Sequence, residues 1–133
     1  MTSALQELWP GLQTSLETLA GELRTRHPGL WGRAASTSND AFPFSANLSF
    51  ISGDPKVDEE DVVFSLSFKA QGSLILFDSD IAAGSGEILM DGPTDQFDSK
   101  APDGDELDWG RRCVAEALGF AQANLRAIED ALR

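Results

Sequence analysis

Apolar residues recur at spacings of three and four along residues 3–27, which predicts an amphipathic helix. Ser3 and Gln6 form a candidate capping box, and Pro28 with Gly29 ends the pattern. Pro10 lies inside the segment, where it removes one backbone donor. We therefore expect one helix that bends at Pro10. The alternative is a short turn over residues 3–9, followed by a main helix that begins at Pro10.

The same spacing returns near Asp105 and continues to Leu132, so a second helix is predicted at the end of the chain. Asp108 would then occupy the third helical position, where a carboxylate favours a helix N-terminus. A second apolar stripe, which includes Trp109, Cys113 and Phe120, runs beside the first one. The apolar face is therefore wider than one contact with a sheet requires.

Strands are predicted between the two helices. Residues 46–51 and 62–69 alternate between apolar and polar, which is typical of half-buried strands. Residues 73–77 are apolar on both faces, residues 87–90 form a fourth candidate, and a short strand over 33–37 is compatible with the sequence. Short connections favour antiparallel neighbours. Residues 91–104 are acidic and contain Pro and Gly, which predicts a surface loop.

A chain of 133 residues fits one domain, and we expect residues 1–133 to form it. Each predicted element has at least one apolar face that must be covered. The sequence therefore predicts an α+β fold. We expect an antiparallel meander of about four strands, with the N-terminal and C-terminal helices packed on one of its faces.

The charge distribution is very uneven. The chain carries 22 acidic and 10 basic residues, a formal charge of −12, and residues 54–108 hold fifteen of the acids but only three lysines. This balance argues against binding to nucleic acid or to an anionic membrane. The first basic residue is Arg24 and no apolar run exceeds four residues, so we expect a cytoplasmic protein without a secretory signal or a membrane span.

Candidate catalytic groups are few. His27, the only histidine, lies at a predicted helix end, and Cys113, the only cysteine, lies on an apolar helix face. Asp78 and Asp80 are two residues apart, about 7 Å on one face of a strand, a separation that suits a carboxylate pair. Both follow Phe77, where the strand is expected to end, so neither should be buried enough for acid–base catalysis. We expect no enzyme, no catalytic residue and no cofactor.

The acidic segments and one tryptophan are the candidate binding residues. Long-range attraction from such segments would speed encounter with a basic protein partner. Trp31 follows the first helix in a Gly-rich stretch; burial is favoured there, yet it is the best single candidate for an exposed contact. The candidate set for the partner is Asp58, Glu59, Glu60, Asp61, Asp78, Asp80, Asp95, Asp98 and Trp31.

The chain is similar in size and charge to bacterial immunity proteins and antitoxins, which neutralise a partner. It is also similar to type III secretion chaperones, which are small, acidic and dimeric, but it lacks the middle helix that interrupts their strands. We therefore predict a protein-binding module that neutralises or escorts a basic partner. The alternative is a metal- or small-molecule-binding accessory domain of an enzyme system. If charge does not guide the partner, a homodimer through the last helix is expected.

Overall fold

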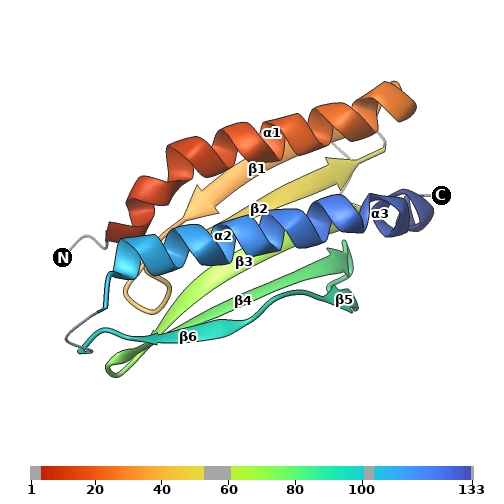
Figure 1. The fold of residues 1–133 in the computed structure, drawn as a ribbon. Coiled ribbons are helices and arrows are strands. Elements are labelled where there is room, and N and C mark those ends of the chain that lie inside the picture. Colours follow the sequence, from red (N-terminus) through yellow and green to blue (C-terminus); the bar gives the residue numbers. More distant parts are fainter. Residues whose placement is uncertain (1–3, 53–60, 101–103, 133) are drawn as a thin grey trace.

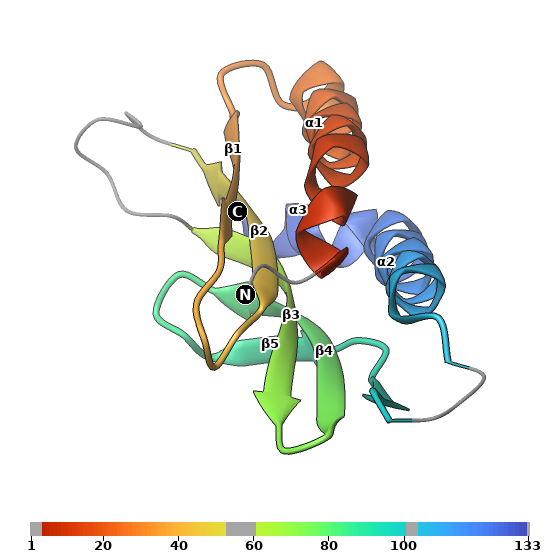
Figure 2. The same cartoon turned by 90° about the vertical axis from the view of Figure 1, so that its left-hand side faces the viewer.

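The computed structural model describes residues 4–52, 61–100 and 104–132. Two long helices, α1 (Trp9–Arg26) and α2 (Glu106–Ala123), lie side by side across one face of a twisted antiparallel sheet (Figure 1). The strands are β1 (Trp31–Thr37), β2 (Phe44–Ile51), β3 (Val62–Gln71), β4 (Leu74–Ala83), β5 (Ile88–Asp91) and β6 (Asp95–Asp98). Viewed along the helices, the molecule has two layers, with the opposite face of the sheet left without a helix (Figure 2). The predicted α+β class and the placement of both helices are confirmed.

The first helix follows the second of the two alternatives. A 3-10 turn, η1 (Ala4–Leu8), precedes α1, and Pro10 occupies the first turn of the α-helix. A backbone N–H in that turn has no intrahelical acceptor, so proline costs little there and no bend in a long helix is needed. Leu12, Leu16 and Leu19 are among the residues that α1 buries against the sheet.

The sheet has more strands than the sequence predicts. Its order is β1-β2-β3-β4-β5, and β6 also pairs with β4. β6 pairs with Leu74–Phe77 and β5 with Asp80–Ala82, so the two short strands follow one another along β4. The prediction of a surface loop over 91–104 is therefore wrong at Asp95–Asp98. Phe97 is the only apolar residue of β6, so its sequence shows no alternation.

β4 continues well past Phe77, where the sequence analysis ended it. The reason is Ser79, a polar residue that is buried at a core-facing position of the strand. Its hydroxyl donates to the Pro93 carbonyl at 2.8 Å, and its own carbonyl accepts from the Gly92 N–H at 2.9 Å. Burial of a hydroxyl group that has a hydrogen-bond partner costs little free energy, so the strand can continue through Ser79. Asp78 and Asp80 consequently lie within β4 and not in a turn.

Aromatic rings join both helices to the sheet. Phe44, Phe68 and Phe77 are direct neighbours on β2, β3 and β4, with ring centroids 6.2 and 5.0 Å apart. Trp109 of α2 contacts Phe68 at 5.5 Å, and Trp9 of α1 contacts Phe44 at 6.5 Å. Trp109 is buried as predicted, whereas Trp9 is only partly buried against the core.

The second helix begins as the sequence predicts and ends earlier. The Asp105 carboxylate accepts from the Asp108 N–H at 3.1 Å, which caps α2. Asn124 interrupts the helix, and its side-chain amide donates to the Phe120 carbonyl at 2.8 Å. A shorter helix, α3 (Leu125–Ala131), follows. The predicted continuous helix is therefore two helices.

Gly32 sets the distance between α1 and β1, and its replacement by alanine should destabilise the fold. A Cβ at Gly32 would lie 2.6 Å from the Cβ of Ala20, a methyl group that cannot rotate away. We expect Gly32→Ala to lower the free energy of unfolding by about 1–3 kcal/mol in urea denaturation. Gly119→Ala is the control, because nothing lies within 4 Å of a Cβ there. It should raise the free energy of unfolding by up to ~1 kcal/mol through helix propensity. Equal effects of the two variants would contradict this packing account.

Candidate functional site

The side of the sheet opposite the helices is the candidate functional surface, because no described helix covers it. We call it the open face. The side chains at its central positions on β2 and β3 are small and polar. Carboxylates lie on β4 and on the two short strands that pair with β4, β5 and β6. The residues of the open face that matter below are Ser65, Ser67, Lys69, Asp78, Asp80, Asp91 and Asp98.

Three carboxylates meet on neighbouring strands of the open face. Asp78 and Asp80 project from β4 beside Ser67 and Ser65, and Asp91 of β5 pairs directly with Asp80. Burial raises the pKa of Asp80 above its ordinary value, and the negative charges of Asp78 and Asp91 raise this pKa further. Like charges directly opposite one another destabilise a sheet. The fold therefore holds an unfavourable negative cluster on an exposed surface.

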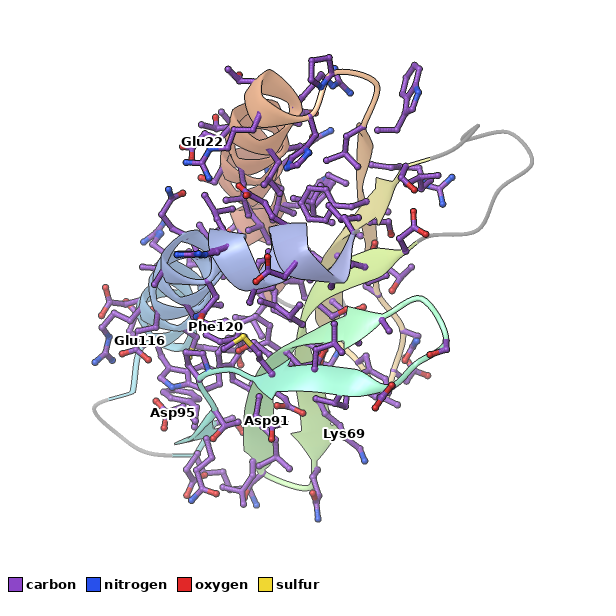
Figure 3. The ribbon with its side chains drawn as sticks, turned by 90° about the vertical axis from the view of Figure 1, so that its right-hand side faces the viewer. Glu22, Lys69, Asp91, Asp95, Glu116 and Phe120 are labelled. Atoms are coloured by element: carbon purple, nitrogen blue, oxygen red, sulfur yellow. The ribbon has the colours of Figure 1, made fainter. Side chains whose placement is uncertain are left out.

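No cation of the described residues forms an ion pair with this cluster. The ion pairs among the described residues join Arg26 to Glu129 and Arg112 to Asp108. His27 also lies beside Glu129, and all of these contacts are in the helical layer. Lys69, on the open face of β3, lies opposite Leu76 and points away from the helices (Figure 3). The negative charge of the cluster is thus left to solvent or to a partner.

The other predicted acidic residues are dispersed. Asp98 lies on the open face of β6 and accepts from the Lys100 N–H at 3.0 Å. Asp61 accepts from the N–H and the hydroxyl of Ser52, at 2.8 and 2.7 Å. Asp95 lies on the helix side of the sheet, where it accepts from the indole N–H of Trp109 at 3.1 Å (Figure 3). The remaining candidates, Asp58, Glu59 and Glu60, lie outside the described residues.

Asp91 belongs to the cluster although it is not among the predicted binding residues. The predicted strand over 87–90 stopped one residue before Asp91, which was assigned to the following loop. Extending the strand by one residue would have placed a carboxylate on it. The sequence could not show that this residue pairs with Asp80, because that requires the register of β5 on β4.

Trp31 is half exposed, with 50% of its surface accessible, so the expectation of burial is wrong. It begins β1, the edge strand of the sheet, where only one neighbouring strand can cover it. The Arg24 guanidinium lies over the indole ring, 5.6 Å from its centroid. The Arg24 Nε–H also donates to the Leu30 carbonyl at 3.1 Å, which fixes the guanidinium beside the ring.

The groups most often used in catalysis lie apart from one another. His27 ends α1, with its Nε2 3.8 Å from a carboxylate oxygen of Glu129. A hydrogen bond from Arg26 lowers the pKa of that carboxyl group. Cys113 is buried in α2, and burial raises the pKa of its thiol to about 12, with Asp95 and Glu116 adding to the rise. A thiol with this pKa is protonated at neutral pH and is a poor nucleophile.

Among the described residues, neither the cavities nor the clusters of possible metal ligands indicate a catalytic centre. A groove of about 340 Å³ between α1 and α2 contains one carboxylate, Glu22, which accepts from the Gln122 amide at 2.9 Å. Its other lining residues are hydroxyl-bearing, aliphatic or glycine. Among the described residues, no group of His, Cys, Asp and Glu side chains could hold a metal ion.

Most of the broad apolar face of the last helix is buried against other parts of the same chain. Trp109, Cys113 and Ala117 of α2 are buried against the sheet, and Phe120 is partly buried beside Phe64 at 6.5 Å. Little of this face remains for a second copy. The homodimer stays a prediction, and the described part of α2 offers no large free apolar face for it.

Comparison with known protein families, with curated proteins and with solved structures found no match to this chain. None of the described helices has the length and hydropathy that a membrane span needs. The open face, the exposed tryptophan and the grooves along α1 are therefore the features from which a function must be argued.

Neutralising Asp80 should stabilise the protein at neutral pH. Its pKa in the folded state lies above the ordinary 3.8, so the folded state binds this proton more readily than the unfolded state. The contribution of Asp80 to stability is therefore highest at low pH and falls as the pH rises through the folded pKa. We expect Asp80→Asn to raise the urea midpoint at pH 7, with a gain that shrinks as the pH falls toward 3.8.

Asp40→Asn provides the control, because Asp40 is exposed and lies in the connection between β1 and β2, whereas the three aspartates lie on β4 and β5. Its effect should stay within about 0.5 kcal/mol at both pH values. A loss of stability in Asp80→Asn at pH 7 would mean that the ionised carboxylate has a favourable partner.

Proposed function

We propose that this chain is a non-catalytic protein-binding module whose open face binds a basic partner protein. In this proposal the partner supplies cations that pair with the aspartates of the open face, and the module neutralises or escorts it. The described residues offer no paired nucleophile and base, which favours binding over catalysis.

One observation carries the proposal: Asp78, Asp80 and Asp91 are held together without an ion pair on a face that no described helix covers. Such an arrangement costs stability in the free chain. A bound lysine or arginine would remove the repulsion, so part of that cost would be recovered on binding. Natural proteins commonly accept such a cost where function requires it.

The serines beside the carboxylates suit the same partner. Ser65 and Ser67 lie opposite Asp80 and Asp78, and both are partly exposed. Their hydroxyl groups can accept hydrogen bonds from a guanidinium or an ammonium group. An arginine placed over β3 and β4 could then contact a carboxylate and a hydroxyl at once, which favours arginine-rich surfaces in the partner.

The test compares three baits for capture of proteins from the native host at low salt. The first bait is the unchanged chain, and the second carries Asp78→Asn, Asp80→Asn and Asp91→Asn. The third removes the same formal charge from the helical layer through Glu7→Gln, Glu116→Gln and Asp130→Asn. We expect basic proteins on the first and third baits and their loss from the second. With the purified partner, the open-face variant should associate on the order of tenfold more slowly.

Salt provides an independent check, since attraction between exposed charges is largely screened beyond about 10 Å at 0.1 M ionic strength. The captured protein should elute as salt is raised, from the unchanged chain and the helix variant alike. Equal capture by the open-face variant would contradict the proposal. Loss of the partner from the helix variant alone would also contradict the proposal.

A further inference from the structure

β1 is an edge strand with an unoccupied side. It stands at the end of the sheet order and, among the described residues, pairs only with β2. Alternate backbone N–H and C=O groups of Trp31–Thr37 therefore face away from the sheet without a strand partner. Natural edge strands are usually protected by proline, by several charges or by a bulge. β1 has no proline, pairs in regular register over all seven residues and carries one charge, Arg33.

A groove runs along this edge between α1 and β1. The helix packs directly on the strand, because a Cβ at Gly32 would come within 2.6 Å of the Cβ of Ala20. Alongside this contact, the small helix-facing residues of β1 leave space beneath α1. Figures 1 and 2 show α1 following β1 along the upper edge of the sheet.

Two cavities open along the groove. The first, of about 140 Å³, is lined by α1 and the first half of β1, including Glu17, Gly21, Arg24, Gly32 and Ala34. The second, of about 170 Å³, is lined by the segment around Trp9 and the end of β1, including Gln6, Ser36 and Ser38. An apolar cavity of about 150 Å³ holds a benzene-sized group. Each cavity therefore has room for one side chain of about that size.

The spacing of the cavities matches a β-strand. One lies at Gly32 and Ala34 and the other at Ser36 and Ser38, four residues further along the chain. Four residues of a strand span about 13 Å, and side chains four apart point to the same face. An added strand would thus direct its residues i and i+4 toward α1. Glu17 and Arg24 bear opposite charges, and the second cavity is lined by one amide and three hydroxyl groups beside two aromatic rings. Small uncharged side chains, including polar ones, therefore fit both cavities.

Trp31 completes the groove at one end. Its ring is half exposed and contacts Arg24, which also lines the first cavity. A strand added to this edge would have one end beside this ring. Exposed aromatic residues of this kind are common anchors in protein interfaces.

A second copy of the chain does not fit this edge. Paired strands lie about 4.8 Å apart, whereas packed helices need about 8–10 Å between their axes. Because α1 rests on β1 itself, pairing β1 with its copy would bring the two α1 helices too close together. The occupant must be an extended segment that carries no helix over it.

We propose that the groove between α1 and β1 binds an extended peptide segment of another protein, which adds to β1 as a further strand. The backbone of the segment pairs with the free edge, and small uncharged side chains at positions i and i+4 fill the two cavities. This mode of recognition takes affinity from main-chain hydrogen bonds and specificity from alternate side chains. The groove lies on the helix side, so the inference goes beyond the proposed function of the open face.

Random decapeptides displayed on phage and selected against the full chain in 0.5 M NaCl provide the test, because this salt screens attraction to the open face. The strongest peptide is then synthesised and titrated against two variants. Gly21→Leu fills the first cavity, and Gly119→Leu fills the groove between α1 and α2; neither glycine has an atom within 4 Å of its Cβ position. We expect Gly21→Leu to weaken binding at least about tenfold and Gly119→Leu to leave it unchanged.

Hydrogen exchange places the peptide. Bound peptide should slow the exchange of amides within Trp31–Thr37 and not those of the open-face strands β4 and β5. Ser38→Leu, at the second cavity, should also weaken binding, which keeps the test decisive if Gly21→Leu fails to fold. The proposal is overturned by full affinity in both groove variants, by loss of affinity in Gly119→Leu, or by selection that yields no peptide. A dimer of the unchanged chain that Gly21→Leu abolishes would assign the edge to a second copy and overturn it too.

Discussion

The architecture depends on a row of aromatic rings on one side of the sheet. Phe44, Phe68 and Phe77 form a row across three strands on that side, and both helices place a tryptophan against the row. Burial of these rings is the dominant favourable term, since each removes a large apolar area from water. Both helices therefore pack on the same face, and no described helix covers the other face. The two candidate binding surfaces follow from this asymmetry.

The two surfaces differ in the kind of partner they suit. On the open face the recognisable feature is charge, held on rigid strands and left without ion pairs in the described residues. Along β1 the feature is a free backbone edge beside two small cavities. Charge acts at long range and is weakened by salt, whereas backbone pairing acts only at contact. One protein could meet both surfaces, because β1 borders the open face as well as the groove.

Polar contacts also join the helices to one another within their layer. Gln122 of α2 donates to Glu22 of α1, and Arg26 at the end of α1 pairs with Glu129 of α3. Exposed pairs of this kind contribute little stability individually. They do fix the two helices relative to each other, and α1 is the wall of the groove beside β1. The width of that groove thus depends on contacts made on the opposite side of the helix.

Periodicity in the sequence was sufficient to predict the class of the fold. The amphipathic patterns along residues 9–26, 62–71 and 106–123 reflect the spacing at which side chains share one face of a helix or a strand, which is a local property. Burial of Trp109 and Cys113 followed from the same patterns. Three features depended on contacts between distant segments. β6 exists because β4 offers it an edge, β4 continues because Pro93 accepts from the Ser79 hydroxyl, and Asp91 joins Asp80 through the register of β5. Trp31 is exposed because, among the described strands, β1 has a neighbour on one side only. Pairing and edges are properties of the assembled sheet, so no local pattern encodes them.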